Sequence, residues 1–109
     1  MLKSTAVHQT KAKTFMNEKI ASILVNLNRS LLRKFPAKGF HYSYDSDGDY
    51  HHGCIFLDVP PEVNFDDDSV QERYYNLLYP YFADFLCHIT LFEAFEIDNS
   101  PWVKDAVKL

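Results

Sequence analysis

The first stretch of the chain repeats apolar residues with the period of a helix. Between Thr10 and Phe35 these residues recur at spacings of three and four, and neither Gly nor Pro interrupts the segment. This spacing places them on one face of an α-helix. Pro36 and Gly39 follow, and both residue types commonly end helices. We therefore predict one long helix with a buried stripe of Phe15, Met16, Ile20, Ile23, Leu24, Leu27, Leu31 and Phe35.

The next two segments have the pattern of β-strands joined by a tight turn. Phe40–Tyr44 and His51–Val59 are rich in aromatic and β-branched residues, and the run Asp45–Asp49 between them contains an Asp-Gly pair. Such pairs favour hairpin turns, and Pro60 and Pro61 would end the second strand. Alternation predicts a hairpin face that packs on the long helix, formed by Phe40, Tyr42, Tyr44, Ile55, Leu57 and Val59.

A second helix is predicted after the acidic run Asp66–Asp68. Carboxylates at a helix N-terminus accept hydrogen bonds from free backbone N–H groups and complement the helix dipole. Pro80 should kink this helix or begin a new one, because its ring removes a backbone donor. The apolar residues that follow the acidic run at helical spacing are Val70, Tyr74, Leu77, Leu78 and Tyr81.

The last third of the chain carries two competing patterns. Over 81–97, the residues Phe82 and Phe85 begin a helical spacing, whereas Leu91 and Phe95 belong to an alternating, strand-like one. We favour a helix here and keep a strand as the alternative. Ser100 and Pro101 resemble a helix cap followed by a first-turn proline, which predicts a short terminal helix through Val107.

These elements amount to a single α+β domain over residues 1–109. It has a long N-terminal helix packed on a central antiparallel β-hairpin, followed by C-terminal helices and, in the alternative, a further strand. The 47% hydrophobic and 24% charged residues are typical of a globular domain. Cys54 and Cys87 form no close-spaced pair, and the apolar run Ile20–Val25 is too short for a signal or membrane segment, so we expect a cytoplasmic protein without a membrane partner.

Charge changes this picture because it is divided along the chain. Residues 1–38 hold eight basic side chains against Glu18 alone, a net charge of +7, whereas residues 39–109 hold three against 14 carboxylates, a net charge of −11. In one interpretation the basic helix packs beside the acidic elements and offsets their repulsion. In the other, the acidic surface faces a basic partner. The −11 charge would repel phosphates, so direct nucleic-acid binding is not expected.

Two groups of residues invite a metal hypothesis. Asp45, Asp47 and Asp49 alternate as in a calcium loop, but Tyr50 stands where that loop needs glycine, and Phe56 stands where it needs glutamate. We therefore expect an acidic turn. His52 and Cys54 would share a strand face with Asp58, but zinc would still lack a fourth ligand, so we expect no metal or other cofactor.

Histidine chemistry supplies the alternative from a different functional class. His41, His51, His52 and His88 could each move a proton near neutral pH, but no motif places them together, and no phosphate loop or nucleophile elbow is present. A small hydrolase or nuclease using His51, His52 and a carboxylate is therefore kept only as the alternative. We expect a protein without enzymatic activity.

The function that we favour is inhibition of a basic protein partner. Acidic, tyrosine-rich surfaces can occupy the phosphate-binding cleft of a nuclease, as an immunity protein or antitoxin would do against a bacterial toxin. A phage anti-defence protein or DNA mimic would use the same carboxylates. The predicted partner-binding residues are Asp45, Asp47, Asp49, Tyr50, Glu62, Asp66, Asp67, Asp68 and Glu72.

Overall fold

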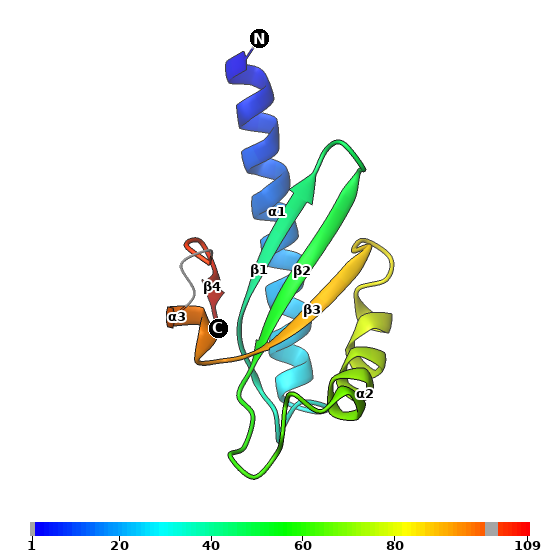
Figure 1. Cartoon of the computed structure of the whole chain (residues 1–109). Helices are drawn as coiled ribbons and strands as arrows, with labels where there is room; N and C mark the ends of the chain where they lie inside the picture. The colour runs from blue at the N-terminus through cyan, green and yellow to red at the C-terminus, as the bar shows by residue number, and fades with distance from the viewer. Residues whose placement is uncertain (1, 100–102) are drawn as a thin grey trace.

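The computed structural model describes the backbone of residues 2–99 and 103–109, and the side chains from residue 13 onward within those ranges. It confirms the predicted α+β class, with a long helix lying against a four-stranded mixed sheet (Figure 1). The elements in chain order are α1 (Leu2–Asn28), β1 (Ala37–Asp45), β2 (Tyr50–Leu57), α2 (Asp68–Leu78), the 3-10 helix η1 (Tyr79–Tyr81), β3 (His88–Glu93), α3 (Glu96–Asn99) and β4 (Val107–Lys108).

The strands lie in the order β3-β2-β1-β4. β1 and β2 form the predicted antiparallel hairpin, with Asp45 opposite Tyr50 at the turn. β4 adds to β1 in antiparallel orientation, and β3 adds to β2 in parallel. A parallel neighbour needs a connection of about a dozen residues or more, which the segment 58–87 with its helices supplies.

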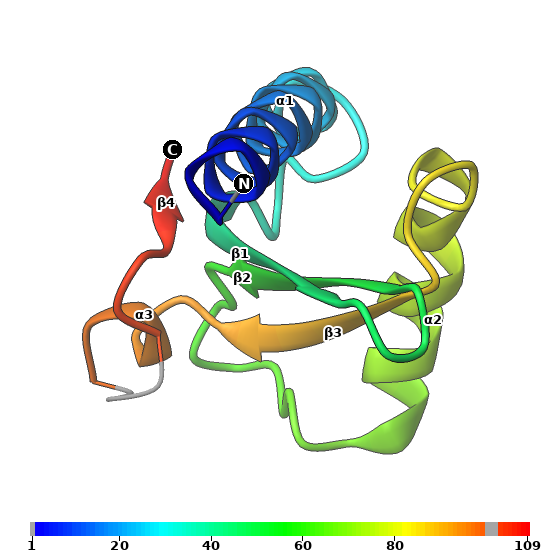
Figure 2. The ribbon, with the colours of Figure 1, turned by 90° about the horizontal axis from the view of Figure 1, so that it is seen from above.

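Side chains that alternate along β2 form two hydrophobic clusters on the two faces of the sheet. Ile55 and Leu57 belong to the larger cluster, together with Leu24 of α1 and Phe40 of β1. The predicted packing of the hairpin on the long helix is thus confirmed, and α1 covers one face of the sheet (Figure 2). The smaller cluster contains Cys54, Phe56, Ile97 and Val103.

The predicted end of the long helix is wrong. α1 ends at Asn28, whose side-chain amide donates to the carbonyl oxygen of Ala37 at 2.9 Å, while its side-chain oxygen accepts from the Ala37 N–H at 2.7 Å. These two bonds fix a compact turn before β1. The turn buries Leu32 and leaves Leu31 43% exposed, and Phe15 at the other end of the predicted stripe is 63% exposed.

The helix predicted over 81–97 is also wrong. After η1 the chain turns and forms β3, in which Ile89 and Leu91 are buried. The structure thus follows the alternating pattern of these residues and not the helical one. Backbone hydrogen bonding to β2 explains this outcome. Without β3, the N–H and C=O groups along one edge of β2 would have no strand to pair with. The predicted terminal helix falls partly on residues 100–102, outside the described ranges, and its end at Val107 lies instead in β4.

The start of α2 agrees with the sequence prediction. Asp67 is the N-cap, and its carboxylate accepts from the backbone N–H of Ser69 at 2.9 Å and from the Ser69 hydroxyl at 2.7 Å. These hydrogen bonds lower the pKa of Asp67. α2 ends at Leu78, and Pro80 lies at the start of the 3-10 helix η1, in agreement with the prediction that it begins a new helix. Among the helices that the structure describes, none is both long and apolar enough to cross a membrane.

Candidate functional site

The hairpin end carries the first group of predicted partner-binding residues. Asp45, Asp47, Asp49 and Tyr50 are all exposed there. The turn is ordered by its own side chains, because Asp45 accepts from the Asp47 N–H at 3.0 Å and Asp49 accepts from the Tyr44 hydroxyl at 2.7 Å. That hydrogen bond to Asp49 is the main cause of a raised pKa at Tyr44. The hairpin end therefore presents fixed carboxylates beside two partly exposed tyrosine rings.

The second predicted acidic group lies at the opposite end of the sheet. Tyr50 and Leu57 begin and end β2, which separates them by about 23 Å at the usual rise of a strand. Figure 1 shows the hairpin turn at one end of β2 and the loop that leads into α2 at the other. The structure therefore does not bring the predicted residues into one patch. The exposed residues of the far group are Glu62, Asp66, Asp67, Asp68 and Glu72.

Neither acidic group forms an ion pair with a described lysine or arginine. The ion pairs that involve lysine or arginine, among side chains from residue 13 onward, join Lys13 to Asp105 and Lys108 to Asp98, each at 2.7 Å. In α1, the ion pair recorded for the described side chains is that of Lys13, and its partner Asp105 belongs to the C-terminal segment. These contacts therefore do not support the interpretation in which the positive charge of the long helix offsets the repulsion within the two acidic groups.

A cleft of about 880 Å³ opens between α1 and the hairpin. One wall comes from α1 and includes the exposed ring of Phe15, and the other comes from β1 and the turn, including Tyr44, which is 48% exposed. Asp49 also lines the cleft and places a carboxylate there. The residues that line this cleft are Lys13, Phe15, Met16, His41, Tyr42, Ser43, Tyr44, Ser46, Asp49 and His51.

A chain of polar contacts stiffens the hairpin wall of the cleft. The Tyr42 hydroxyl lies 2.7 Å from Nδ1 of His51, and Nε2 of the same ring lies 3.6 Å from the Asp49 carboxylate. A proton on Nε2 suits both contacts, since the hydroxyl can then donate to Nδ1. The Tyr44 ring stacks on His51 with centroids 4.5 Å apart. Burial, with a smaller contribution from Asp49, raises the pKa of Tyr42 and keeps its hydroxyl protonated.

The two histidines of the enzymatic alternative face opposite sides of the sheet. His51 points to the α1 face, whereas Nε2 of His52 lies 2.7 Å from the Thr90 hydroxyl on the other face. His52 also stacks on His88, and burial, followed by the charge of His88, lowers its pKa. Because adjacent residues of a strand point to opposite faces, His51 and His52 cannot act together on one substrate. Within the described ranges, no three His, Cys, Asp or Glu side chains are grouped to hold a metal ion.

Comparison with known proteins returns no match. No protein-family model, no curated protein and no solved structure matches the chain. Sequence reasoning identified the carboxylates and Tyr50 at the hairpin end but missed Tyr44 and Phe15, which it assigned to the core. The cleft itself had no signal in the sequence, because it depends on where α1 crosses the hairpin.

The two cysteines offer a direct test of this geometry. Burial raises the pKa of the Cys54 thiol to about 11, whereas Cys87 is exposed and its backbone N–H donates to the His51 carbonyl behind the hairpin. Thiolates are the reactive species, so iodoacetamide at mildly alkaline pH should add to Cys87 alone in the folded protein. Intact-mass measurement should show one adduct before denaturation and two afterwards, and Cys87→Ser should show none before it. Equal rates at both thiols would contradict the described burial of Cys54.

Proposed function

We propose that the protein is a small acidic inhibitor that binds a basic protein surface through its hairpin end. The observation that carries the proposal is the arrangement of Asp45, Asp47 and Asp49, exposed and not paired with any described lysine or arginine, beside two tyrosine rings and an open cleft. In this proposal the protein carries out no reaction and needs no cofactor or metal.

The hairpin end has the two components that tight binding of a basic surface requires. Exposed carboxylates steer a positively charged partner during encounter and form charge-assisted hydrogen bonds with it afterwards. Tyr44 and Tyr50, 48% and 41% exposed, supply apolar area with a polar tip, which is typical of binding anchors. The cleft between Phe15 and Tyr44 is open to a lysine or arginine side chain, whose head would meet Asp49.

The class of partner that fits best is a nuclease-type toxin. An enzyme that binds nucleic acid presents lysine and arginine at phosphate positions, and carboxylates fixed on a hairpin can occupy those positions. The protein would then act as a cytoplasmic immunity protein or antitoxin in bacteria. A phage anti-defence protein or DNA mimic would use the same surface against another DNA-binding enzyme.

The far acidic group has a smaller role in this proposal. Asp67 is occupied in capping α2, and the group lies beyond the other end of β2 from the hairpin. Its charges add to long-range attraction, which salt screens over about 10 Å at moderate ionic strength. Contacts in the bound state would therefore come from the hairpin end.

Matched charge changes at the two acidic groups test the proposal. The first variant combines Asp47→Lys with Asp49→Asn, since asparagine tolerates the positive φ of 47° at that position. The control combines Asp66→Lys with Glu62→Gln, which changes the net charge equally. Against the product of the neighbouring gene, or a protein captured from the native host, the hairpin variant should associate about tenfold more slowly at low salt, and the control less than about threefold.

The outcome separates the proposal from its alternatives. Association rates measured by surface plasmon resonance over a salt series should converge at high salt, because steering is screened. Protection of Cys87 from iodoacetamide in the complex would support binding at the hairpin end. Equal slowing in both variants, or an unchanged rate in the hairpin variant, would remove the hairpin from the interface. Capture of nucleic acid in place of a protein would overturn the proposal.

A further inference from the structure

A second concave surface lies between α2 and the turn that follows α1. Its volume is about 590 Å³, within the range of small-molecule sites. Arg33 and Lys34 come from the turn, and Arg73 comes from α2. Arg73 is the single arginine of the acidic part of the chain, residues 39–109, so the fold brings it to the end of the basic segment. The pocket therefore collects cations from two distant parts of the sequence.

These three cations have no ion-pair partner among the described carboxylates. The residues one helical turn on either side of Arg73 are Ser69, Val70, Asn76 and Leu77, none of which is acidic. In a chain with 15 carboxylates, an uncompensated cationic pocket is attractive to an external anion. The contacts described for these side chains are with uncharged groups: Nε of Arg33 donates to the Arg29 carbonyl, and the Arg73 guanidinium lies 6.0 Å from the centroid of the Tyr74 ring.

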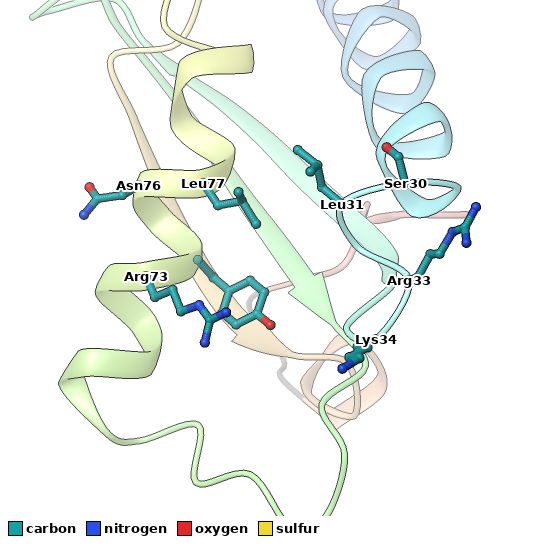
Figure 3. A pocket seen from close by; sticks show the side chains of 8 residues that line it. Ser30, Leu31, Arg33, Lys34, Arg73, Asn76 and Leu77 are labelled. Carbon is teal, nitrogen blue, oxygen red and sulfur yellow. The ribbon is translucent and has the colours of Figure 1, made fainter.

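The lining of the pocket includes both cationic and apolar side chains. Figure 3 shows Lys34 and Arg73 on opposite sides of the opening, with Leu31 and Leu77 directed toward the space between the two elements. Arg33 points away toward the outer side in the same view. Leu31 is 43% exposed, an apolar surface that the fold leaves uncovered here. The pocket thus offers two cations to a head group and two leucines to a short apolar body.

Tyr74 limits what that apolar body can be. Its ring stacks on Phe35 with centroids 4.4 Å apart, and the Arg73 guanidinium lies over it at 6.0 Å. The Arg73 guanidinium thus lies near an aromatic face, on which arginine commonly stacks. The Phe35 ring covers one face of Tyr74, which leaves less of this ring for an aromatic ligand. Leucine side chains favour an aliphatic body instead.

We propose that this pocket binds a small phosphate monoester with an aliphatic body. A phosphate monoester carries a charge of about −1.5 to −2 at neutral pH, which two flanking cations match. Arginine can bind its oxygens with two parallel N–H donors, and lysine adds a point charge from the other side. This site lies apart from the hairpin end and does not depend on the function proposed there.

Titration of the full chain with hexyl phosphate tests the site. Amide chemical shifts in ¹H–¹⁵N spectra should change saturably for residues 30–34 and 73–77. Arg73→Gln and Lys34→Gln should each weaken binding at least about tenfold, because each removes a charge-assisted contact. Lys104→Gln removes an exposed cation outside the pocket and should change the affinity by less than about twofold. Circular dichroism of all variants should match the unmodified protein, since the replaced side chains do not belong to the core.

Three further probes make the result decisive. Inorganic phosphate should bind at the same residues but more weakly, and hexanol should not bind there, because head and body act together. Absence of saturable shifts with hexyl phosphate, or equal affinity in Arg73→Gln, would overturn the proposal. A single-stranded oligonucleotide that binds more tightly than hexyl phosphate and loses affinity steeply with salt would assign the cations to nucleic acid instead.

Discussion

Phe82→Ala is expected to lower the free energy of unfolding by about 3–5 kcal/mol, the cost of removing a large aromatic side chain from a closed core. Phe82 has 0% exposure and belongs to the larger hydrophobic cluster, where it meets Phe85 edge to face at 6.0 Å. It lies between η1 and β3, so it anchors the connection that delivers β3 to the sheet. Urea denaturation followed by circular dichroism would measure the loss.

Phe95→Ala is the matched control for this prediction. Phe95 is 61% exposed, so its loss should change the free energy of unfolding by about 0.5 kcal/mol or less. If Phe82→Ala does not fold, Phe82→Leu keeps most of the apolar area and still allows the comparison. Similar losses for Phe82→Ala and Phe95→Ala, or a fully native stability of Phe82→Ala, would contradict the placement of Phe82 in the core.

Local signals were sufficient for the hairpin and for the start of α2. The Asp-Gly turn between two β-rich segments predicted β1 and β2, and the acidic run predicted an N-cap, which the structure assigns to Asp67. In both cases the deciding interactions join residues close in sequence. The end of α1 was mispredicted for the opposite reason, because Asn28 bonds to Ala37 in a turn that periodicity cannot reveal.

β3 shows how tertiary pairing overrides a balanced local pattern. Its sequence fits helical and alternating spacings about equally, so the choice depends on whether a strand edge is available. β2 provides that edge, since Cys54, Ile55, Phe56 and Leu57 are all buried. Such an unbroken apolar run is typical of a central strand covered on both faces. This apolar run in the sequence therefore indicated that β2 is a central strand with a neighbour on each side.

The sequence predicted the acidic turn of the candidate site but not the cleft beside it. Turn chemistry exposes Asp45, Asp47 and Asp49, and the sequence identified them for that reason. The predicted partner-binding residues do not form one patch, because a strand of eight residues separates the turn from the loop before α2. The cleft and the basic pocket were beyond sequence reasoning, since each is formed by elements that meet only in the folded chain.

Gly39 marks the place where the C-terminal segment closes on the sheet. It lies in β1 between Phe56 of β2 and Lys108 of β4. A Cβ atom at this position would lie 2.7 Å from the Val107 carbonyl oxygen and would also overlap the Ile97 side chain. The backbone oxygen cannot move aside without breaking the pairing of β4. Only glycine therefore allows α3 and β4 to approach β1 as they do.

Gly39→Ala is accordingly expected to cost about 3 kcal/mol of folding free energy, near the upper end for overpacking, and to detach β4 before the rest of the sheet. Hydrogen exchange should show this as faster exchange of the Leu109 amide, which donates to the Lys38 carbonyl at 2.9 Å. Gly48→Ala is the control: a Cβ there would meet only Tyr50 at 3.9 Å, and Gly48 has no positive φ. That variant should be unchanged or about 0.4–1 kcal/mol more stable, because alanine restricts the unfolded chain. Equal stability of the two variants would show that β4 does not pack against Gly39 as closely as described.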